Sequence, residues 1–293
     1  MKHRIYDHRV LTIFAMLGLF TALLIPPTWA LSLVGIDTSA ASGRAIMAVC
    51  TIAIALFLQL VVYERRVKGE VGSALTWSTA GLFMAMPALC FAACNFIGFE
   101  PADLAKMNPI PLALLLAASP GISEEILFRG IPTSNWMRLG CDTRSIIWST
   151  VITSLVFGVV HGLNAISGEP LATAAFQVFY SACIGLVFNA VYLRSGSIVP
   201  AMIMHTITDF TAFLFLDLQH GGVITKELTL SFSFWATLVV TMAMLAWGTY
   251  LLRPSKHGEI VALWQEKCHR GQSVPSVNRG SFRTVSRPSS FRG

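Results

Sequence analysis

The stretch IPLALLLAASPGISEEILFRG, residues 110–130, decides the fold of this chain. Its first half is a continuous apolar run, and its second half carries Glu124, Glu125 and Arg129. An apolar run of about 20 residues crosses a bilayer as a helix, and an ionisable group inside such a helix costs a few kcal/mol or more. The stretch therefore predicts a membrane-spanning helix that contains a functional site.

Composition extends this interpretation to the whole chain. Apolar residues make up 54% of the sequence and charged residues 12%, with a mean hydropathy of +0.65. A soluble globular protein carries about 25% charged residues. We expect an all-α, polytopic membrane protein of about eight transmembrane helices. The expected spans are residues 10–34, 45–64, 73–98, 109–138, 145–165, 171–193, 197–217 and 231–252.

The distribution of Lys and Arg predicts the orientation. Basic residues gather before the first span, in alternate loops and in the C-terminal tail, whereas the other loops hold only Arg44, Lys106 and Lys226. This bias predicts an integral, multi-pass protein with both termini in the cytoplasm, in a membrane such as the bacterial inner membrane. The net charge of +6 then reflects topology and anionic lipid. No basic helix or aromatic-basic platform suggests a nucleic-acid partner.

The predicted spans divide the chain into four regions. Residues 1–108 form N-terminal transmembrane helices, 109–217 a catalytic core, and 218–252 contain a final transmembrane helix. Residues 253–293 end in a segment rich in Ser, Arg and Gly that cannot bury a core. We expect this last region to be a disordered cytoplasmic tail.

Helical phase separates the two adjacent glutamates. Consecutive residues lie about 100° apart around a helix, so the two side chains cannot face the same point. Glu125 precedes Arg129 by four residues, the favourable order for an ion pair, and we expect these two charges to compensate each other as structural support. Glu124 is left without a local partner, and a carboxyl group in that position suits acid-base chemistry.

A histidine in the next span is predicted to lie level with Glu124. A turn near residue 142 separates the two spans, and Glu124 precedes it by about as many residues as separate it from His161. In an antiparallel helical hairpin the two side chains come level, so His161 can bind the same water as Glu124 or a metal beside it.

A third span, with the sequence AMIMHTITDF, contributes His205 and Asp209. These residues are four apart and share one helix face. Three roles fit them: a pair of metal ligands, a carboxylate that orients a histidine, or two donors that stabilise an oxyanion. The chain contains no HExxH, GxSxG or Walker motif, so a Ser triad and ATP hydrolysis are not supported. Glu124, His161, His205 and Asp209 together suit the activation of water against a carbonyl.

The three polar segments resemble the motifs of a known family. EEILFRG is similar to the EExxxR motif, FGVVH to FxxxH and HTITD to HxxxN/D of the CPBP family, over roughly residues 110–215. That family contains intramembrane proteases, including type 2 CAAX prenyl endopeptidases and bacteriocin-processing or immunity proteins.

The resemblance implies a role for each residue. It assigns Glu124 as the catalytic glutamate and His161 as its helper in activating water, with Glu125 and Arg129 as structural residues. It assigns His205 and Asp209 to oxyanion-stabilising or metal-associated positions. Because Asp donates a hydrogen bond only when protonated, Asp209 is better suited to orienting His205. Zinc bound by Glu124, His161 and His205, as in a metalloprotease, and a metal-free glutamate mechanism both remain open.

Three functions follow from these residues. The first is an intramembrane endopeptidase that cleaves a membrane-associated, prenylated or leader-type peptide near the cytoplasmic side of the bilayer. The second is a proton-coupled transporter, since intramembrane Glu and His also form proton relays. The third is a non-catalytic immunity or scaffold protein. In each case the bilayer is a partner, and for the protease a peptide or protein substrate in the membrane is the other.

Overall fold

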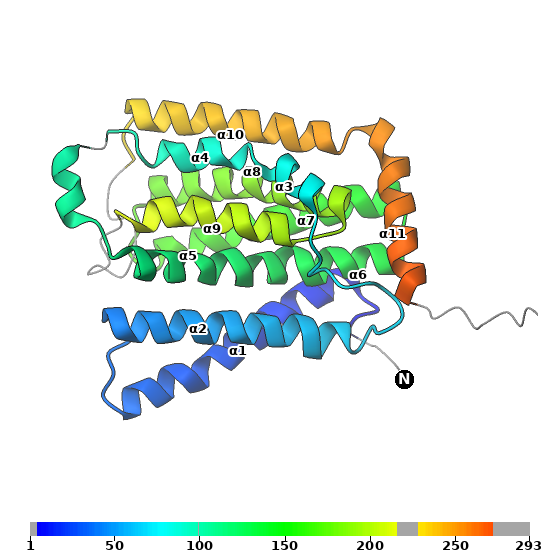
Figure 1. Ribbon diagram of the computed structural model, residues 1–293, viewed down its shortest axis with the longest axis horizontal. Helices are drawn as coiled ribbons and strands as arrows, with labels where there is room; N and C mark the ends of the chain where they lie inside the picture. Colours follow the sequence, from blue (N-terminus) through cyan, green and yellow to red (C-terminus); the bar gives the residue numbers. More distant parts are fainter. Residues whose placement is uncertain (1–4, 99, 216–227, 272–293) are drawn as a thin grey trace, which may run out of the picture.

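The computed structural model describes residues 5–98, 100–215 and 228–271 (Figure 1). This described part of the chain is built of helices and contains no strand, so the predicted all-α class is confirmed. The elements are α1 (Arg9–Leu33), α2 (Ala41–Phe57), η1 (Leu58–Glu64), α3 (Thr79–Ala85), α4 (Ala88–Cys94), η2 (Pro101–Lys106), α5 (Ile110–Glu125), η3 (Ile126–Gly130), α6 (Ile131–Leu139), α7 (Thr143–His161), η4 (Gly162–Ala165), α8 (Leu171–Ser195), α9 (Val199–Phe213), α10 (Phe232–Leu251), η6 (Pro254–Lys256) and α11 (His257–Gly271).

Six helical segments are long and apolar enough to cross a membrane within the described ranges. The predicted count of about eight spans is therefore not confirmed. The expected span 73–98 is two short helices, because Pro87 has no N–H to donate and disfavours helical geometry at the residue before it. The expected span 197–217 contains the 15-residue α9, and its last two residues lie outside the described part.

The helices pack side by side into one bundle (Figure 1). Helix α5 packs against α2 and α9, while α8 packs against α7 and α10. The start of α1 and α11 lie at the same end of the bundle, which we call the terminal end, and the α1–α2 and α7–α8 connections lie at the opposite end (Figure 1). The residues of the predicted site lie on α5, α7 and α9, in the interior of this bundle.

Glycines let the central helices approach closely. A Cβ atom built on Gly158 of α7 would lie 2.6 Å from the carbonyl oxygen of Val178 on α8. Small residues at such crossings bring helix backbones together in membrane bundles, where lipid supplies no hydrophobic drive for association. The depth and rotation of α7, and thus of His161, are set by this contact.

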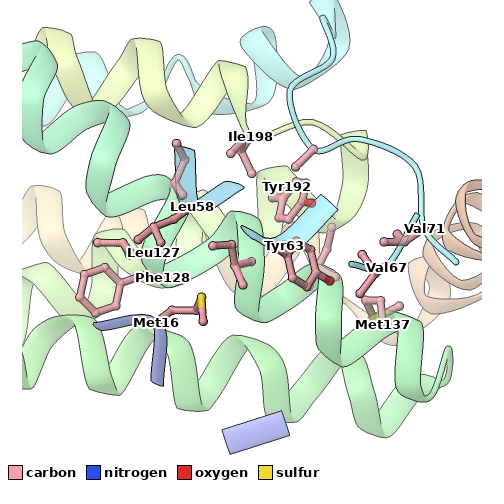
Figure 2. Packing of buried hydrophobic residues seen from close by; sticks show 14 of the residues in the cluster. Met16, Leu58, Tyr63, Val67, Val71, Leu127, Phe128, Met137, Tyr192 and Ile198 are labelled. Atoms are coloured by element: carbon pink, nitrogen blue, oxygen red, sulfur yellow. The ribbon is translucent and has the colours of Figure 1, made fainter. Parts of the chain in front are cut away.

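The main apolar core lies toward the terminal end of the bundle (Figure 2). There Leu58 and Tyr63 of η1 meet Leu127 and Phe128 of η3, and Tyr192 of α8 packs from another side. All five side chains are buried. This core contains the segment directly after Glu124 and Glu125. The backbone that carries the two glutamates is therefore fixed by packing on the side of the terminal end.

The beginning of the predicted disordered tail is helical, which corrects the expectation for residues 253–271. Helix α11 buries Ile260 and Trp264, four residues apart on one face, and Trp264 Nε1 donates a hydrogen bond to Leu193 O at 3.0 Å. Lys267 Nζ donates to Ser73 O at 2.8 Å and also to Gly196 O. These contacts cap the last turn of α8 and stabilise α11 across the terminal end. Residues 272–293 lie outside the described part of the chain.

Candidate active site

The two glutamates lie at a change of helical geometry. Helix α5 ends at Glu125, and the π-helical segment η3 follows directly as Ile126–Gly130. Pro120 lies one turn before Glu124 and removes one backbone hydrogen bond from the helix. Short π-helical segments inside longer helices are frequent at functional sites.

The predicted ion pair between Glu125 and Arg129 is present and fully buried. Arg129 Nη1 donates to Glu125 Oε1 at 2.8 Å, and both side chains have no exposed surface. The guanidinium carbon lies 4.0 Å from the ring centroid of Phe157, a cation–π distance. Gly185 leaves room for this group, since a Cβ atom there would lie 2.7 Å from Arg129 Nη2. The positive charge is thus enclosed by one carboxylate, the rings of Phe128 and Phe157, and one glycine.

Glu125 has a second contact, with His205, that the sequence did not predict. His205 Nδ1 lies 2.9 Å from Glu125 Oε1, the same oxygen that accepts from Arg129. A carboxylate oxygen accepts hydrogen bonds, so Nδ1 is the donor. Arg129, Glu125 and His205 therefore form a continuous chain of charge-assisted contacts from η3 to α9. No sequence signal links positions 80 residues apart on separate helices.

The other ring nitrogen of His205 faces two carboxyl groups. Nε2 lies 3.5 Å from Asp209 Oδ2 and 3.7 Å from Glu124 Oε2. Asp209, which we expect to orient the His205 ring, meets Nε2 of that ring, while Glu125 holds Nδ1. The Glu124 and Asp209 side chains are each 28% exposed, whereas the Glu125 side chain is fully buried. The adjacent glutamates thus have separate environments, as helical phase predicts.

His161 is oriented by the backbone of its own helix. Its Nδ1 lies 2.8 Å from the carbonyl oxygen of Phe157, one turn earlier. Because a carbonyl oxygen only accepts, Nδ1 carries the proton and Nε2 of a neutral ring is left as an acceptor. The Phe157 ring packs edge-on against His161 with centroids 4.6 Å apart and lies 6.0 Å from the His205 ring. Phe157 therefore separates the two histidines and fixes their spacing, a role that the sequence did not reveal.

One cavity brings the predicted site residues together. It has a volume of about 550 Å³ and is lined by Glu124, His161, His205 and Asp209. Glu125 and Arg129 lie behind its wall. Each of α5, α7 and α9 supplies at least one polar side chain, so the site is assembled only when the three helices pack. Such a cavity, apolar with a few convergent polar groups, is the usual form of an active site.

The residues in the cavity do not form a recognisable metal site. Within residues 5–98, 100–215 and 228–271, no group of three or more His, Cys, Asp or Glu side chains is arranged to hold a metal ion. His161 and His205 each have Nδ1 engaged by a protein oxygen, as metal-bound histidines also do, so these contacts do not argue against a metal. As they are placed, the described residues form no set of three zinc ligands.

The spacing of α5 and α9 at the site depends on Gly121. A Cβ atom at this position would lie 2.8 Å from Thr206 N and 3.0 Å from Thr206 Cα on α9. These are backbone atoms, so the Gly121→Ala substitution must push α9 away from α5. We expect cleavage by this variant to fall by about 10²-fold, because a displacement of about 1 Å in a catalytic group has an effect of that size. The measurement is kcat/KM of the purified variant.

The matched control for Gly121→Ala is Gly18→Ala in α1. A Cβ atom on Gly18 meets no atom within 4 Å. Alanine is the better helix former, so the control should be as active and at least as stable as the original chain. Unchanged activity in Gly121→Ala would show that the α5–α9 spacing does not control the site.

The fold and the cavity define a class: a multi-pass, all-helical integral membrane protein with a buried Glu/His site. One known family is similar to part of the chain. Residues 106–211 match the family described as type II CAAX prenyl endopeptidase Rce1-like. This segment contains Glu124, Arg129, His161, His205 and Asp209. The match covers less than half of the chain, and it makes this segment similar to a family of endopeptidases. No curated protein and no solved structure gives a significant match to the chain.

Proposed function

We propose that this chain is an intramembrane endopeptidase that hydrolyses a peptide bond with a water activated by Glu124 and His161. The observation that carries the proposal is the convergence of Glu124, His161, His205 and Asp209 on one cavity inside a helical bundle. The family match supports proteolysis in general. The substrate class we assign is a membrane-associated peptide, of the prenylated or leader type.

In the first step, water adds to the carbonyl carbon of the scissile bond. Glu124 faces the cavity with a partly exposed carboxylate that can take a proton from this water. The unprotonated Nε2 of His161 can accept a hydrogen bond from the same water and orient its lone pair. The C–O bond forms as the carbonyl π electrons move to oxygen, which gives a tetrahedral oxyanion.

In the second step the C–N bond breaks. His205 is the donor to the oxyanion in this proposal, since Glu125 holds its Nδ1 and directs Nε2 into the cavity. The proton held on Glu124 passes to the leaving nitrogen, which departs as an amine, and the other product is a carboxylic acid. Asp209, 3.5 Å from the same Nε2, balances the charge of His205. No step in this sequence requires a metal ion.

The experiment is hydrolysis of synthetic single-span peptides by the purified chain in ¹⁸O-labelled water. We expect new peptide termini in mass spectra, with one ¹⁸O atom in each new carboxyl group, and no products from the His161→Ala variant. A chelator added to the same assay separates metal-dependent from metal-free hydrolysis. Products formed equally by His161→Ala would assign the cleavage to a contaminant, and the absence of any product would favour a non-catalytic protein.

A further inference from the structure

The cavity of the candidate site reaches the surface at the end of the bundle opposite the terminal end. Its lining includes Asn164 and the exposed Ser167, from the connection between α7 and α8. Helix α8 ends beside α11, where Lys267 contacts Gly196. With 25 residues at 1.5 Å each, the start of α8 lies about 37 Å away along the helix. The mouth of the cavity is therefore remote from both described ends of the chain (Figure 1).

The wall of this mouth contains a buried carboxyl group that the proposed mechanism does not use. Glu169 lines the cavity and is 3% exposed, and its Oε1 atom has no hydrogen-bond partner in the described part of the chain. Few buried carboxylate oxygens are left unpaired, because the loss of hydration is not compensated. The unpaired oxygen can accept a hydrogen bond from a donor group of a bound ligand.

The local backbone holds Glu169 in this place. Gly168 has a φ angle of +102°, a conformation that other residues rarely adopt, and it turns the chain just before Glu169. Glu169 N donates to Asn164 O at 3.0 Å, and Asn164 Nδ2 donates to Gln177 Oε1 at 2.8 Å. The carboxyl group is thus fixed by a turn, a backbone bond and a supporting amide pair.

The electrostatics of the mouth favour a cationic ligand. Burial raises the pKa of Glu169, while a hydrogen bond from Asn164 acts to lower it. A cation beside a buried carboxylate compensates the cost of its burial. Within the described residues, no Lys or Arg side chain lines the cavity. The described residues that line the cavity therefore supply no Lys or Arg cation for this carboxyl group.

We propose that substrate enters the cavity at this mouth and that Glu169 binds a Lys or Arg side chain of the substrate. The proposal rests on the proposed function, since it takes the cavity to hold a peptide. It differs from the cleavage near the cytoplasmic side expected from the sequence, because the predicted topology puts this mouth on the other face of the membrane. Glu169 is a specificity residue here and takes no part in the bond-breaking steps.

The test measures binding, so it does not require catalysis. The protein is the full chain with Glu124→Gln, in nanodiscs of phosphatidylcholine. The probes are two fluorescent single-span peptides of Leu and Ala, one with Lys and one with norleucine at the same flanking position. We expect the Lys peptide to bind about tenfold more tightly, the effect of one charge-assisted hydrogen bond. Adding Glu169→Gln should abolish that difference, and adding Glu100→Gln should keep it, because Glu100 does not line the cavity.

The location of binding is tested by cysteine protection. In a background without the native cysteines, Ser167→Cys lines the cavity, whereas Ile166→Cys is next to it in sequence, is 84% exposed and does not line the cavity. We expect the Lys peptide to slow labelling of Ser167→Cys by a membrane-impermeant maleimide and to leave Ile166→Cys unchanged. A Lys preference that survives Glu169→Gln, or equal protection of both cysteines, would overturn the proposal. Specific binding without any hydrolysis would instead reject the proposed function and still support Glu169 as a binding site for Lys or Arg.

Discussion

Glu124→Gln is expected to reduce kcat/KM for peptide hydrolysis by about 10²–10⁴-fold, the usual contribution of a general base. The amide keeps the size of the side chain and cannot take the proton of the attacking water. Glu124 has one close charged contact, with His205 Nε2 at 3.7 Å, and its side chain is partly exposed, so the fold does not depend on it. The measurements are initial rates over a range of peptide concentrations and thermal unfolding of the same samples.

A matched variant distinguishes the loss of a catalytic carboxylate from the loss of any one negative charge. Glu100→Gln makes the same chemical change at the N-terminal cap of η2, outside the cavity, and should leave kcat/KM unchanged. The catalytic assignment fails if Glu124→Gln turns over substrate at the original rate. If Glu124→Gln loses activity together with thermal stability, Glu124 belongs to the structural framework of the site instead.

Arg129→Met is expected to destabilise the fold by about 3–5 kcal/mol, the usual cost of removing one partner of a buried ion pair. The substitution leaves the Glu125 carboxylate with no exposed surface and without its cation. Methionine fills much of the space, so the loss is mainly electrostatic. The measurement is reversible unfolding in mixed micelles with increasing denaturing detergent. Activity should fall as well, because Glu125 also holds His205 Nδ1.

The double variant Glu125→Gln/Arg129→Met tests whether the stability loss in Arg129→Met comes from an uncompensated buried charge. With both charges removed, no uncompensated charge remains buried, and replacing a whole buried pair by neutral groups is often close to neutral in stability. We expect the double variant to recover most of the stability lost in Arg129→Met. A double variant as unstable as Arg129→Met would show that the guanidinium acts through packing against Phe157 and Gly185 rather than through its charge.

Residue chemistry and helical period were enough to predict much of the candidate site. The cost of burying charge in hydrocarbon pointed to Glu124, His161, His205 and Asp209, and all four line one cavity. The Glu125–Arg129 pair followed from a spacing of four residues, which is local geometry. Helix α11 also had a local signal, Ile260 and Trp264 at a spacing of four, which the polar composition of the following segment obscured.

Contacts between helices could not be predicted in the same way. The bond from His205 to Glu125 depends on how α9 is rotated and how deep it lies relative to α5. Those quantities are set by backbone contacts such as Gly121 against Thr206, and no periodicity along one helix encodes them. The same holds for Glu169, which in the sequence is one acidic residue in a loop and in the fold lines the mouth of the cavity.

The sequence by itself determined that this is a membrane protein, its helical class and which residues line the candidate site, because hydropathy, helical period and the cost of buried charge are properties of single segments. The tertiary structure alone decided that Glu125 also holds His205, and at which end of the bundle the cavity opens. These are relations between helices. These relations arise only when glycines such as Gly121 and Gly158 let the helix backbones approach closely. In the packed bundle the EEILFRG segment, residues 124–130, then forms one wall of the candidate site.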